Sequence, residues 1–343
     1  MADKLILKIL DGETVETPPI WLMRQAGRYL AEYREVRARA GSFVDLCLNP
    51  ELAAEVTFQP IRRFGFDASI LFSDILIVPL GLGRNLRFEE GVGPILDKLE
   101  DPNELPEFDE DKFHAVVGNV YETVARLKEG LPKEVGLIGF AGSPWTVASY
   151  VVEGGSSKDY AKLKTLAYRD PVGFQKLIDL LVEATVAYLD RQVLAGAEII
   201  KLFDSWAGAA PVSIFETAVI GATKEIVSRL RAKHPALKII GFARGAGALT
   251  ERYAKETDVD AVALDSSMPF TLAKDLQKVL PVQGNLDPIA LVAGGDALDA
   301  ETDRMMEALA GGPYIANLGH GIVPQTPIPH VEQFINRVRG WRR

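Results

Sequence analysis

The segments PVGFQKLIDLLVEATVAYLDRQVLA (residues 171–195) and EIIKLF (residues 198–203) stand two residues apart and decide the fold class. The first has the periodic apolar pattern of an amphipathic helix, and the second is an apolar run of strand length. The same alternation continues along most of the chain. Strands are predicted at residues 20–23, 68–72, 135–140, 198–203, 238–242, 261–264, 282–284 and 314–318, and further helices at 51–64, 111–128, 211–233, 298–310 and 328–338.

Repeated strand and helix patterns within 343 residues predict a closed (β/α)8 barrel of the TIM type, forming a single domain over residues 1–343. Strands that are apolar almost throughout fit a parallel sheet with both faces buried. An open doubly wound sheet is the alternative that the pattern leaves open. The glycines, prolines and charges of residues 81–106 predict a loop insertion, such as a hairpin, between the second strand and the next helix.

The composition narrows the possible functions. The chain is 48% hydrophobic and 25% charged, and its formal net charge of -9 without a Lys/Arg block argues against nucleic-acid binding. The one cysteine, Cys47, excludes an intrachain disulfide and a multi-thiolate metal site, and it points to a reducing compartment. We see neither a signal-peptide pattern nor an apolar run of membrane length, and therefore expect a cytoplasmic protein with no membrane partner.

Arg24 and Arg28 stand four residues apart directly after the first apolar run. A guanidinium is always charged and offers a planar fork of donors, so two of them can each hold a separate carboxylate of one ligand. A surface helix with two solvated arginines is the plainer interpretation, but Gly27 breaks the helical pattern between them. We therefore predict an anion-binding loop in which Gly27 lets the backbone approach the ligand.

Polar residues also follow the other predicted strands, at the end where a β/α barrel forms its active site. Some of them will be helix caps, but the rest should converge on one mouth. Arg244 and Asp265 are either site residues or, as we prefer, an ion pair at the end of the barrel. The full set comprises Arg24, Arg28, Asp74, Tyr150, Asp204, Ser205, Arg244, Asp265, Asn285, Asp287 and His320.

Longer motifs carry a resemblance to a known family. PIWLMRQAGRYL (residues 19–30) and GFAGSPWT (139–146) resemble the two signatures of uroporphyrinogen decarboxylases. LFSDI (71–75), FDSWAG (203–208), QGNLDP (283–288) and NLGHG (317–321) extend the match over essentially the whole chain, which makes it far more specific than a lone glycine-rich loop. Ala31 and Ala243 depart from the family pattern, in which proline is common, and these departures bear on loop rigidity more than on chemistry.

The resemblance implies a barrel that acts as a homodimer and needs neither a cofactor nor a metal. It also implies decarboxylation of the four acetate side chains of uroporphyrinogen III to methyl groups, giving coproporphyrinogen III and CO2 on the route to haem and related tetrapyrroles. The matching positions imply catalytic roles for Asp74, Arg24, Arg28 and Tyr150. They imply substrate binding by Arg24, Gln25, Ala26, Gly27, Arg28, Asp74, Tyr150, Ser205 and His320.

The residues support this chemistry on physical grounds as well. Loss of CO2 from an acetate arm leaves an electron pair, which a pyrrole can accept once a ring carbon has been protonated. A buried carboxylate beside the pyrrole nitrogens would stabilise the resulting cation, and Asp74 is our candidate, although an aspartate after a strand is more often a cap or turn residue. For Arg24 and Arg28 we prefer anchoring of carboxylates over proton delivery, because arginine is a poor proton donor near neutrality.

Two other functions stay open. A corrinoid-linked methyltransferase on a related barrel typically needs a metal site rich in cysteine and histidine, and the position of Cys47 outside the strand ends weighs against it. A noncatalytic tetrapyrrole-binding barrel would keep Arg24 and Arg28 but would not need Asp74. Lysine-dependent cofactor chemistry is not excluded by composition, and Lys201 lies within its predicted strand, where it could face either side.

Overall fold

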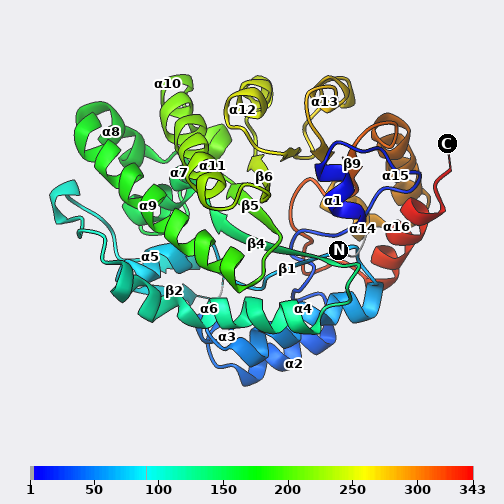
Figure 1. The fold of residues 1–343 in the computed structure, drawn as a ribbon, viewed down its shortest axis with the longest axis horizontal. Helices are drawn as coiled ribbons and strands as arrows, with labels where there is room; N and C mark the ends of the chain where they lie inside the picture. The colour runs from blue at the N-terminus through cyan, green and yellow to red at the C-terminus, as the bar shows by residue number, and fades with distance from the viewer. Residues whose placement is uncertain (1–3, 90, 343) are drawn as a thin grey trace.

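The computed structural model describes residues 4–89 and 91–342, and its centre is a curled parallel sheet of seven strands surrounded by helices (Figure 1). Within this sheet, each strand pairs with the sheet strand that comes next along the chain, as a β/α barrel requires. This arrangement confirms the predicted fold class. The strands are β1 (Ala68–Ile70), β4 (Gly136–Gly142), β5 (Ile199–Asp204), β6 (Lys238–Ala243), β7 (Ala261–Ala263), β8 (Val282–Gln283) and β9 (Tyr314–Ile315).

The helices form the outer layer, with α10, α12 and α13 on one side of the sheet and α4 and α6 on the opposite side (Figure 1). Every predicted helical segment is helical, although 211–233 forms as α10, the π-helical segment η3 and α11. None of the additional helices in the described ranges is longer than ten residues, which is too short for the apolar period to identify a helix. The helices are α1 (Leu5–Leu10), α2 (Ala31–Arg39), α3 (Phe43–Cys47), α4 (Pro50–Phe64), α5 (Ile77–Gly81), α6 (Glu110–Gly130), α7 (Pro144–Glu153), α8 (Ala161–Arg169), α9 (Pro171–Ala195), α10 (Val212–Ile214), η3 (Phe215–Gly221), α11 (Ala222–Lys233), α12 (Thr250–Glu256), α13 (Phe270–Gln277), α14 (Pro288–Ala293), α15 (Gly295–Leu309) and α16 (Ile328–Gly340), with 3-10 turns η1 (Pro102–Glu104), η2 (Ala207–Ala209) and η4 (Gly247–Leu249).

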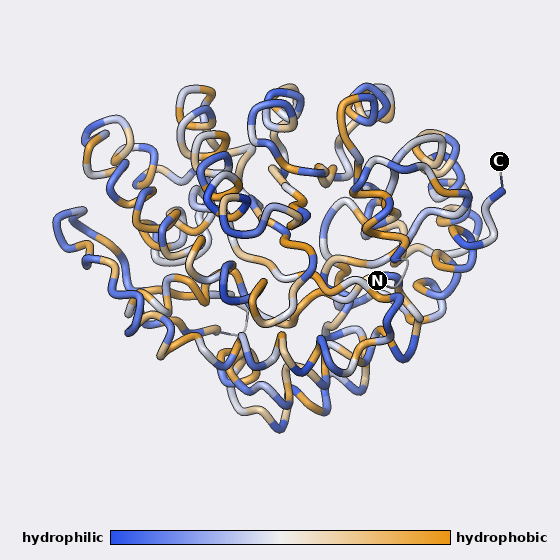
Figure 2. The backbone as a smooth tube through the Cα atoms, in the orientation of Figure 1, coloured by the Kyte–Doolittle hydropathy of each residue, from blue (hydrophilic) through white to orange (hydrophobic). Residues whose placement is uncertain are grey.

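Local signals explain why the unit of α9 and β5 forms. Asp170 caps α9 by accepting a hydrogen bond from the Gly173 N–H (2.9 Å), and Pro171 occupies the first helical position, where its missing N–H has no effect. The helix ends at Ala195, followed by Gly196 as its C-cap, and β5 begins at Ile199 with every residue but one buried. Hydrophobic residues follow the strands and the facing sides of the helices, while hydrophilic residues lie on the outside (Figure 2).

The predicted strand at residues 20–23 is correct only at its first residue. Ile20 forms a single parallel bridge to Ala316 beyond β9, and its C=O accepts from the Asp67 N–H before β1, so this segment lies between the first and last strands. The Trp21 N–H still donates to the Ala316 C=O (3.4 Å), whereas the N–H groups of Leu22 and Met23 donate to side chains. Asn317 Oδ1 accepts from the Met23 N–H (3.1 Å), and this bond ends the strand geometry while still closing the barrel.

Within residues 81–106, β2 (Leu86–Glu89) and β3 (Gly93–Leu96) form an antiparallel hairpin. The hairpin is tied to the end of α7 because the Leu96 N–H donates to the Gly154 C=O (3.0 Å). It thus packs beside the helix that carries Tyr150. None of the helices in the described part of the chain is long and apolar enough to cross a membrane.

Candidate active site

Arg24 and Arg28 lie exposed on the loop between the Ile20 bridge and α2, and neither forms an ion pair with a residue in ranges 4–89 or 91–342. Arg24 has a φ of 62°, a left-handed conformation that costs a non-glycine residue about 1–2 kcal/mol. Its side chain passes directly over Gly321, where a Cβ would overlap the arginine Cδ. The glycine after His320 therefore allows the path that Arg24 takes beside the histidine.

Gln25 holds this loop from behind. The side chain is buried, its Oε1 accepts from the Leu22 N–H (3.2 Å), and its Nε2 donates to the Ala68 C=O of β1 (3.3 Å). Ala26 and Gly27 are half-buried next to it. The side chain of Gln25 is thus engaged with backbone, and its part in substrate binding stays a prediction, as do those of Ala26 and Gly27.

Asp74 lies in the turn between β1 and α5 and is half-buried. Its Oδ1 accepts from the Leu76 N–H (2.9 Å), so the plainer interpretation of a turn residue accounts for one carboxylate oxygen. Its Oδ2 makes no hydrogen bond to any described residue. Burial raises the pKa of Asp74 above its usual range, while the Leu76 N–H and the nearby positive charge of Arg24 lower it in part. One oxygen remains available to a ligand.

Tyr150 lies on α7 and is 8% exposed. Burial raises the pKa of its hydroxyl and a hydrogen bond with the Trp206 side chain lowers it, while the negative charge of Asp74 raises it and the positive charge of Arg24 lowers it. The fields of Asp74 and Arg24 therefore act on Tyr150, and the structure brings these three predicted residues together. Burial raises the pKa of Tyr33 on α2 to about 12, and the positive charge of Arg28 lowers it in part.

His320 follows β9 and is half-buried, with its ring 6.4 Å from that of Phe242 on β6. Burial lowers the pKa of His320 to about 3, and the positive charges of Arg24 and Arg244 lower it as well, against a smaller opposing effect of Asp265. The imidazole is therefore neutral at pH 7, with one nitrogen that donates and one that accepts. Ser205 follows β5, half-buried, and its hydroxyl has no partner within the described residues.

The predicted ion pair of Arg244 with Asp265 is wrong. Both carboxylate oxygens of Asp265 accept hydrogen bonds from nearby backbone. Oδ2 accepts from the Gly245 N–H (2.7 Å), and Oδ1 accepts from the Ser267 N–H (2.9 Å). These bonds organise the loops after β6 and β7. Arg244 stays half-buried near His320, on whose pKa it acts, and so belongs to the same mouth.

Lys201 is the residue whose orientation the sequence left open, and it faces the barrel interior. It is fully buried, and its Nζ lies 5.2 Å from the ring centroid of Trp21, 5.3 Å from that of Phe203 and 5.5 Å from that of Phe242. The amine has no hydrogen-bond partner among the described residues. Burial lowers its pKa well below the usual value. It therefore lies beneath the mouth, enclosed by aromatic rings.

Ala31 and Ala243 also have clear positions. Ala31 is the first residue of α2, where proline would also fit because the N–H at that position has no partner within the helix. Ala243 is the last residue of β6, one position before Arg244. Cys47 is buried at the end of α3, and no group of His, Cys, Asp and Glu side chains with the geometry of a metal site occurs in the part of the chain that the structure describes.

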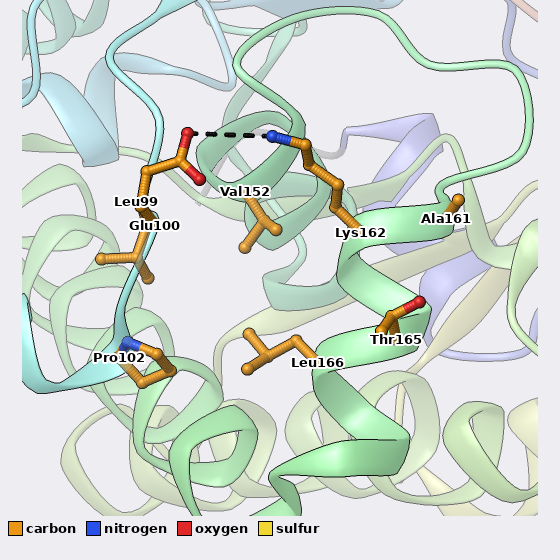
Figure 3. Close-up of a pocket in the computed structure, with 8 residues that line it drawn as sticks. All are labelled: Leu99, Glu100, Pro102, Val152, Ala161, Lys162, Thr165 and Leu166. Atoms are coloured by element: carbon orange, nitrogen blue, oxygen red, sulfur yellow. Dashed lines mark ion pairs between the residues drawn. The ribbon is translucent and has the colours of Figure 1, made fainter.

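A separate cavity of about 350 Å³ is lined by residues of α7, α8 and the segment around η1 (Figure 3). Val152 of α7 forms one wall, and Lys162 of α8 forms an ion pair with Glu100 (3.7 Å) on the opposite wall. None of the predicted site residues lines it. The lining residues are Leu99, Glu100, Pro102, Val152, Ala161, Lys162, Thr165 and Leu166.

The fold and the site define a class, namely a β/α barrel whose strand ends bring together arginine, carboxylate, phenol and imidazole groups. The family model of uroporphyrinogen decarboxylase (URO-D) matches residues 1–341. The chain is 53% identical over 342 residues to the uroporphyrinogen decarboxylase of Chelativorans sp. (strain BNC1), with 100% of both chains covered. It is also 53% identical over 340 residues to that of Maricaulis maris (strain MCS10), covering 99% of this chain and 98% of the other. The chain therefore belongs to the uroporphyrinogen decarboxylase family.

Solved structures agree on the fold. A methyltransferase from Methanosarcina mazei superposes with a TM-score of 0.80 over 97% of this chain and 96% of its own, at 19% sequence identity. A B12-independent methionine synthase from Shewanella sp. W3-18-1 matches less closely, with a TM-score of 0.53 at 9% identity over 84% of this chain and 85% of its own. At such low identities the likeness shows a shared fold alone.

Proposed function

We infer that the chain is a carboxy-lyase that decarboxylates uroporphyrinogen in tetrapyrrole biosynthesis. Membership of the uroporphyrinogen decarboxylase family over the full chain is the observation that carries this conclusion. In finer detail, we propose that each of the four acetate arms of uroporphyrinogen III becomes a methyl group, giving coproporphyrinogen III. Each arm takes up one proton and releases one CO2, so the reaction balances without an oxidant or a reductant, and we propose that it proceeds without a cofactor.

Asp74 is the residue that we propose stabilises the reaction's charge. Protonation of a pyrrole carbon creates a cation, and the electrons of the breaking carboxylate bond then flow into that ring. Asp74 Oδ2, which is free to accept a hydrogen bond, would bind the pyrrole N–H groups while Oδ1 stays held by Leu76. At about 4 Å and an effective dielectric of about 20, this contact contributes roughly 4 kcal/mol, or about three powers of ten in rate if it acts only in the transition state.

The other predicted residues would bind the periphery of the substrate. Arg24 and Arg28 are exposed, always charged and without ion-pair partners in the described ranges, so they are suited to anchor carboxylates on two sides of the mouth. Tyr150, Ser205 and neutral His320 can donate hydrogen bonds to further carboxylates, and we propose Tyr150 as a catalytic residue because it lies within the fields of Asp74 and Arg24. Gln25, Ala26 and Gly27 would complete the binding loop.

We also propose an assembly for this enzyme. Residues 1–343 would act as one domain, and two copies would form a homodimer that works in the cytoplasm. The family resemblance supports the dimer. Light scattering of the purified protein measures its mass directly, and a value near that of two chains is expected, whereas a monomeric value would contradict the proposal.

Anaerobic incubation with uroporphyrinogen III, followed by chromatography of the oxidised products, tests the reaction. We expect stepwise appearance of products with seven to four carboxyl groups without added metal or cofactor, and unchanged rates with a chelator present. Binding of a substrate that keeps all eight carboxyl groups would contradict the proposed function. That outcome would favour the noncatalytic tetrapyrrole-binding barrel.

A further inference from the structure

Trp206, in the turn after β5, belongs to the mouth although the proposed function gives it no role. Its indole is half-buried and packs against the cluster formed by Leu76, Leu96 and Tyr150. Leu76 is the residue whose N–H donates to Asp74. The indole therefore lies in the same patch as the Asp74 turn and the proposed catalytic tyrosine.

Two tyrosines extend the indole into an aromatic wall. The Trp206 ring centroid lies 6.4 Å from that of Tyr150 and 5.7 Å from that of Tyr160, and both pairs are tilted. Tyr160 is buried and has a φ of 54°, a conformation that persists in a non-glycine residue only when its surroundings hold it there. The backbone at Tyr160 is thus held in a costly conformation that directs its ring at Trp206.

The backbone of Trp206 is fixed at both of its polar groups by side chains of α7. Its N–H donates to Thr146 Oγ1 (3.0 Å), and its C=O accepts from Trp145 Nε1 (2.9 Å). The Trp206 C=O also accepts from the Ala209 N–H within its own turn (2.9 Å), so the two side-chain bonds add to the local one. They connect the indole firmly to the helix that also carries Tyr150.

The buried carboxylate of Asp204 orients the Thr146 hydroxyl that bonds to Trp206. Thr146 Oγ1 donates its proton to Asp204 Oδ1 (2.5 Å), so only its lone pairs face the Trp206 N–H. Asp204 is fully buried, and its Oδ2 has no partner among the described residues. A buried polar atom without a partner destabilises a fold, so the visible effect of Asp204 is the orientation of Thr146 and, through it, of Trp206.

We propose that Trp206 is a further substrate-contacting residue of the decarboxylation, whose indole face stacks on the pyrrole cation, and that Thr146 and Asp204 are its positioning residues. The proposal rests on the proposed function, because that reaction creates the positive charge. Indole is the best of the side-chain rings for binding a cation, and a contact shielded from water contributes about 2 kcal/mol, equivalent to about a thirtyfold change in rate.

Replacement of the indole tests the contact. Trp206→Leu should lower kcat about thirtyfold with little change in KM, and Trp206→Phe should restore most of it because a ring face remains. Trp341→Phe, a matched change in a half-buried tryptophan at the other end of the chain, should leave kcat unchanged. Normal kcat in Trp206→Leu, or an increase in KM alone, would overturn the proposal.

Positioning is tested separately at Thr146. Thr146→Val removes both hydrogen bonds and should lower kcat about tenfold, whereas Thr146→Ser keeps the hydroxyl and should restore it. Equal activities of the two variants, after circular dichroism has shown that both fold, would overturn the positioning role. Quenching of indole fluorescence by bound coproporphyrinogen III does not depend on turnover. Quenching of the same size in Trp206→Phe as in the wild type would refute the contact, whereas an inactive wild-type chain would count against the proposed function alone.

Discussion

The two sides of the barrel mouth are built in opposite ways. On the first-loop side, Arg24 and Arg28 are exposed and have no ion-pair partner in the part of the chain described. On the β5 side, Asp204, Thr146 and Trp206 form a bonded series whose members are held from behind. The charged groups on the first-loop side thus remain accessible to a ligand, while the side chains on the β5 side are held in a fixed geometry in advance. Preorganised groups act most strongly where charge develops during a reaction.

Removing the charge of Asp74, between the two sides, should have the largest effect. Asp74→Asn keeps an oxygen for the Leu76 N–H but lacks the negative charge, so we expect a fall in kcat of about a thousandfold with a smaller change in KM. Anaerobic turnover assays measure both parameters. Asp287→Asn is the matched control, because Asp287 caps α14 through the Ile289 N–H and asparagine caps equally well. Near-normal turnover of Asp74→Asn would remove Asp74 from the mechanism.

Ionisation of Asp204, on the β5 side, should change the free energy of unfolding with pH, and this effect should be almost as large. Burial raises the pKa of Asp204 from 3.8 to about 7, so between these values the folded chain binds a proton that the unfolded chain releases. The free energy of unfolding should therefore fall as pH rises from about 4 to about 7, by about 4 kcal/mol. Urea unfolding across this range should show the fall in the wild type and not in Asp204→Asn.

His320 contributes with the opposite sign, and its contribution must be separated. Its pKa is about 3 in the folded chain, so below the usual histidine value of 6.5 the unfolded chain binds the extra proton. The stability that neutral His320 contributes is thus present above pH 6.5 and is lost as pH falls toward 3. His320→Asn should remove this acidic loss only. Parallel pH profiles for wild type and Asp204→Asn would show that Asp204 ionises normally.

Displacing the Arg24 side chain, on the first-loop side, should have a somewhat smaller effect on turnover. Gly321→Ala places a Cβ where the Arg24 side chain runs, so Arg24 must move. Since a hydrogen bond to a charged group contributes about 1.5–3 kcal/mol, we expect kcat/KM to fall about tenfold to a hundredfold, mainly through KM. Gly118→Ala is the matched control, because nothing lies within 4 Å of a Cβ there. An unchanged KM would show that Arg24 does not anchor the substrate.

Elements of the fold that depend on local patterns could be predicted from the sequence, and those that depend on distant side chains could not. The apolar run EIIKLF predicted β5 almost to the residue, because burial on both faces of a sheet is a local and periodic signal. The run at residues 20–23 failed after Ile20, since Met23 bonds to Asn317, a residue 294 positions away. Strand patterns reveal burial but not which distant side chain will accept a backbone N–H.

The candidate site shows the same difference between local sequence patterns, which could be predicted, and contacts between distant residues, which could not. The proximity of Arg24, Asp74 and Tyr150 could be predicted because motifs at strand ends indicate where polar groups gather. The inward orientation of Lys201 could not, because it depends on the register of β5 within the closed sheet, and an apolar run on both faces hides that register. The support of Trp206 by Thr146 was equally hidden, since the two residues lie 60 positions apart. Only FDSW, as a motif, marked that turn as important.

The smallest expected effect concerns the support of the Asp74 turn itself. Tyr188 of α9 is fully buried, and its hydroxyl shares a hydrogen bond with Ser73 Oγ (3.2 Å), the neighbour of Asp74. Tyr188→Phe should lower the free energy of unfolding by about 1 kcal/mol and should reduce kcat about threefold, because the turn gains freedom without losing its charge.

Tyr121→Phe separates these two effects. Its ring lies 5.9 Å from that of Tyr188, but its hydroxyl bonds to His114 Nδ1 (2.8 Å) and not to the Asp74 turn, so its removal should cost about the same stability and leave kcat unchanged. Urea unfolding and turnover assays of both variants give the comparison. Should both variants lose kcat equally, general loosening of the helix layer would be the cause. A loss confined to Tyr188→Phe would show that the Asp74 turn, like the turn at Trp206, depends on a buried hydroxyl next to it. The geometry would then be fixed in advance for the carboxylate that we propose as catalytic as well.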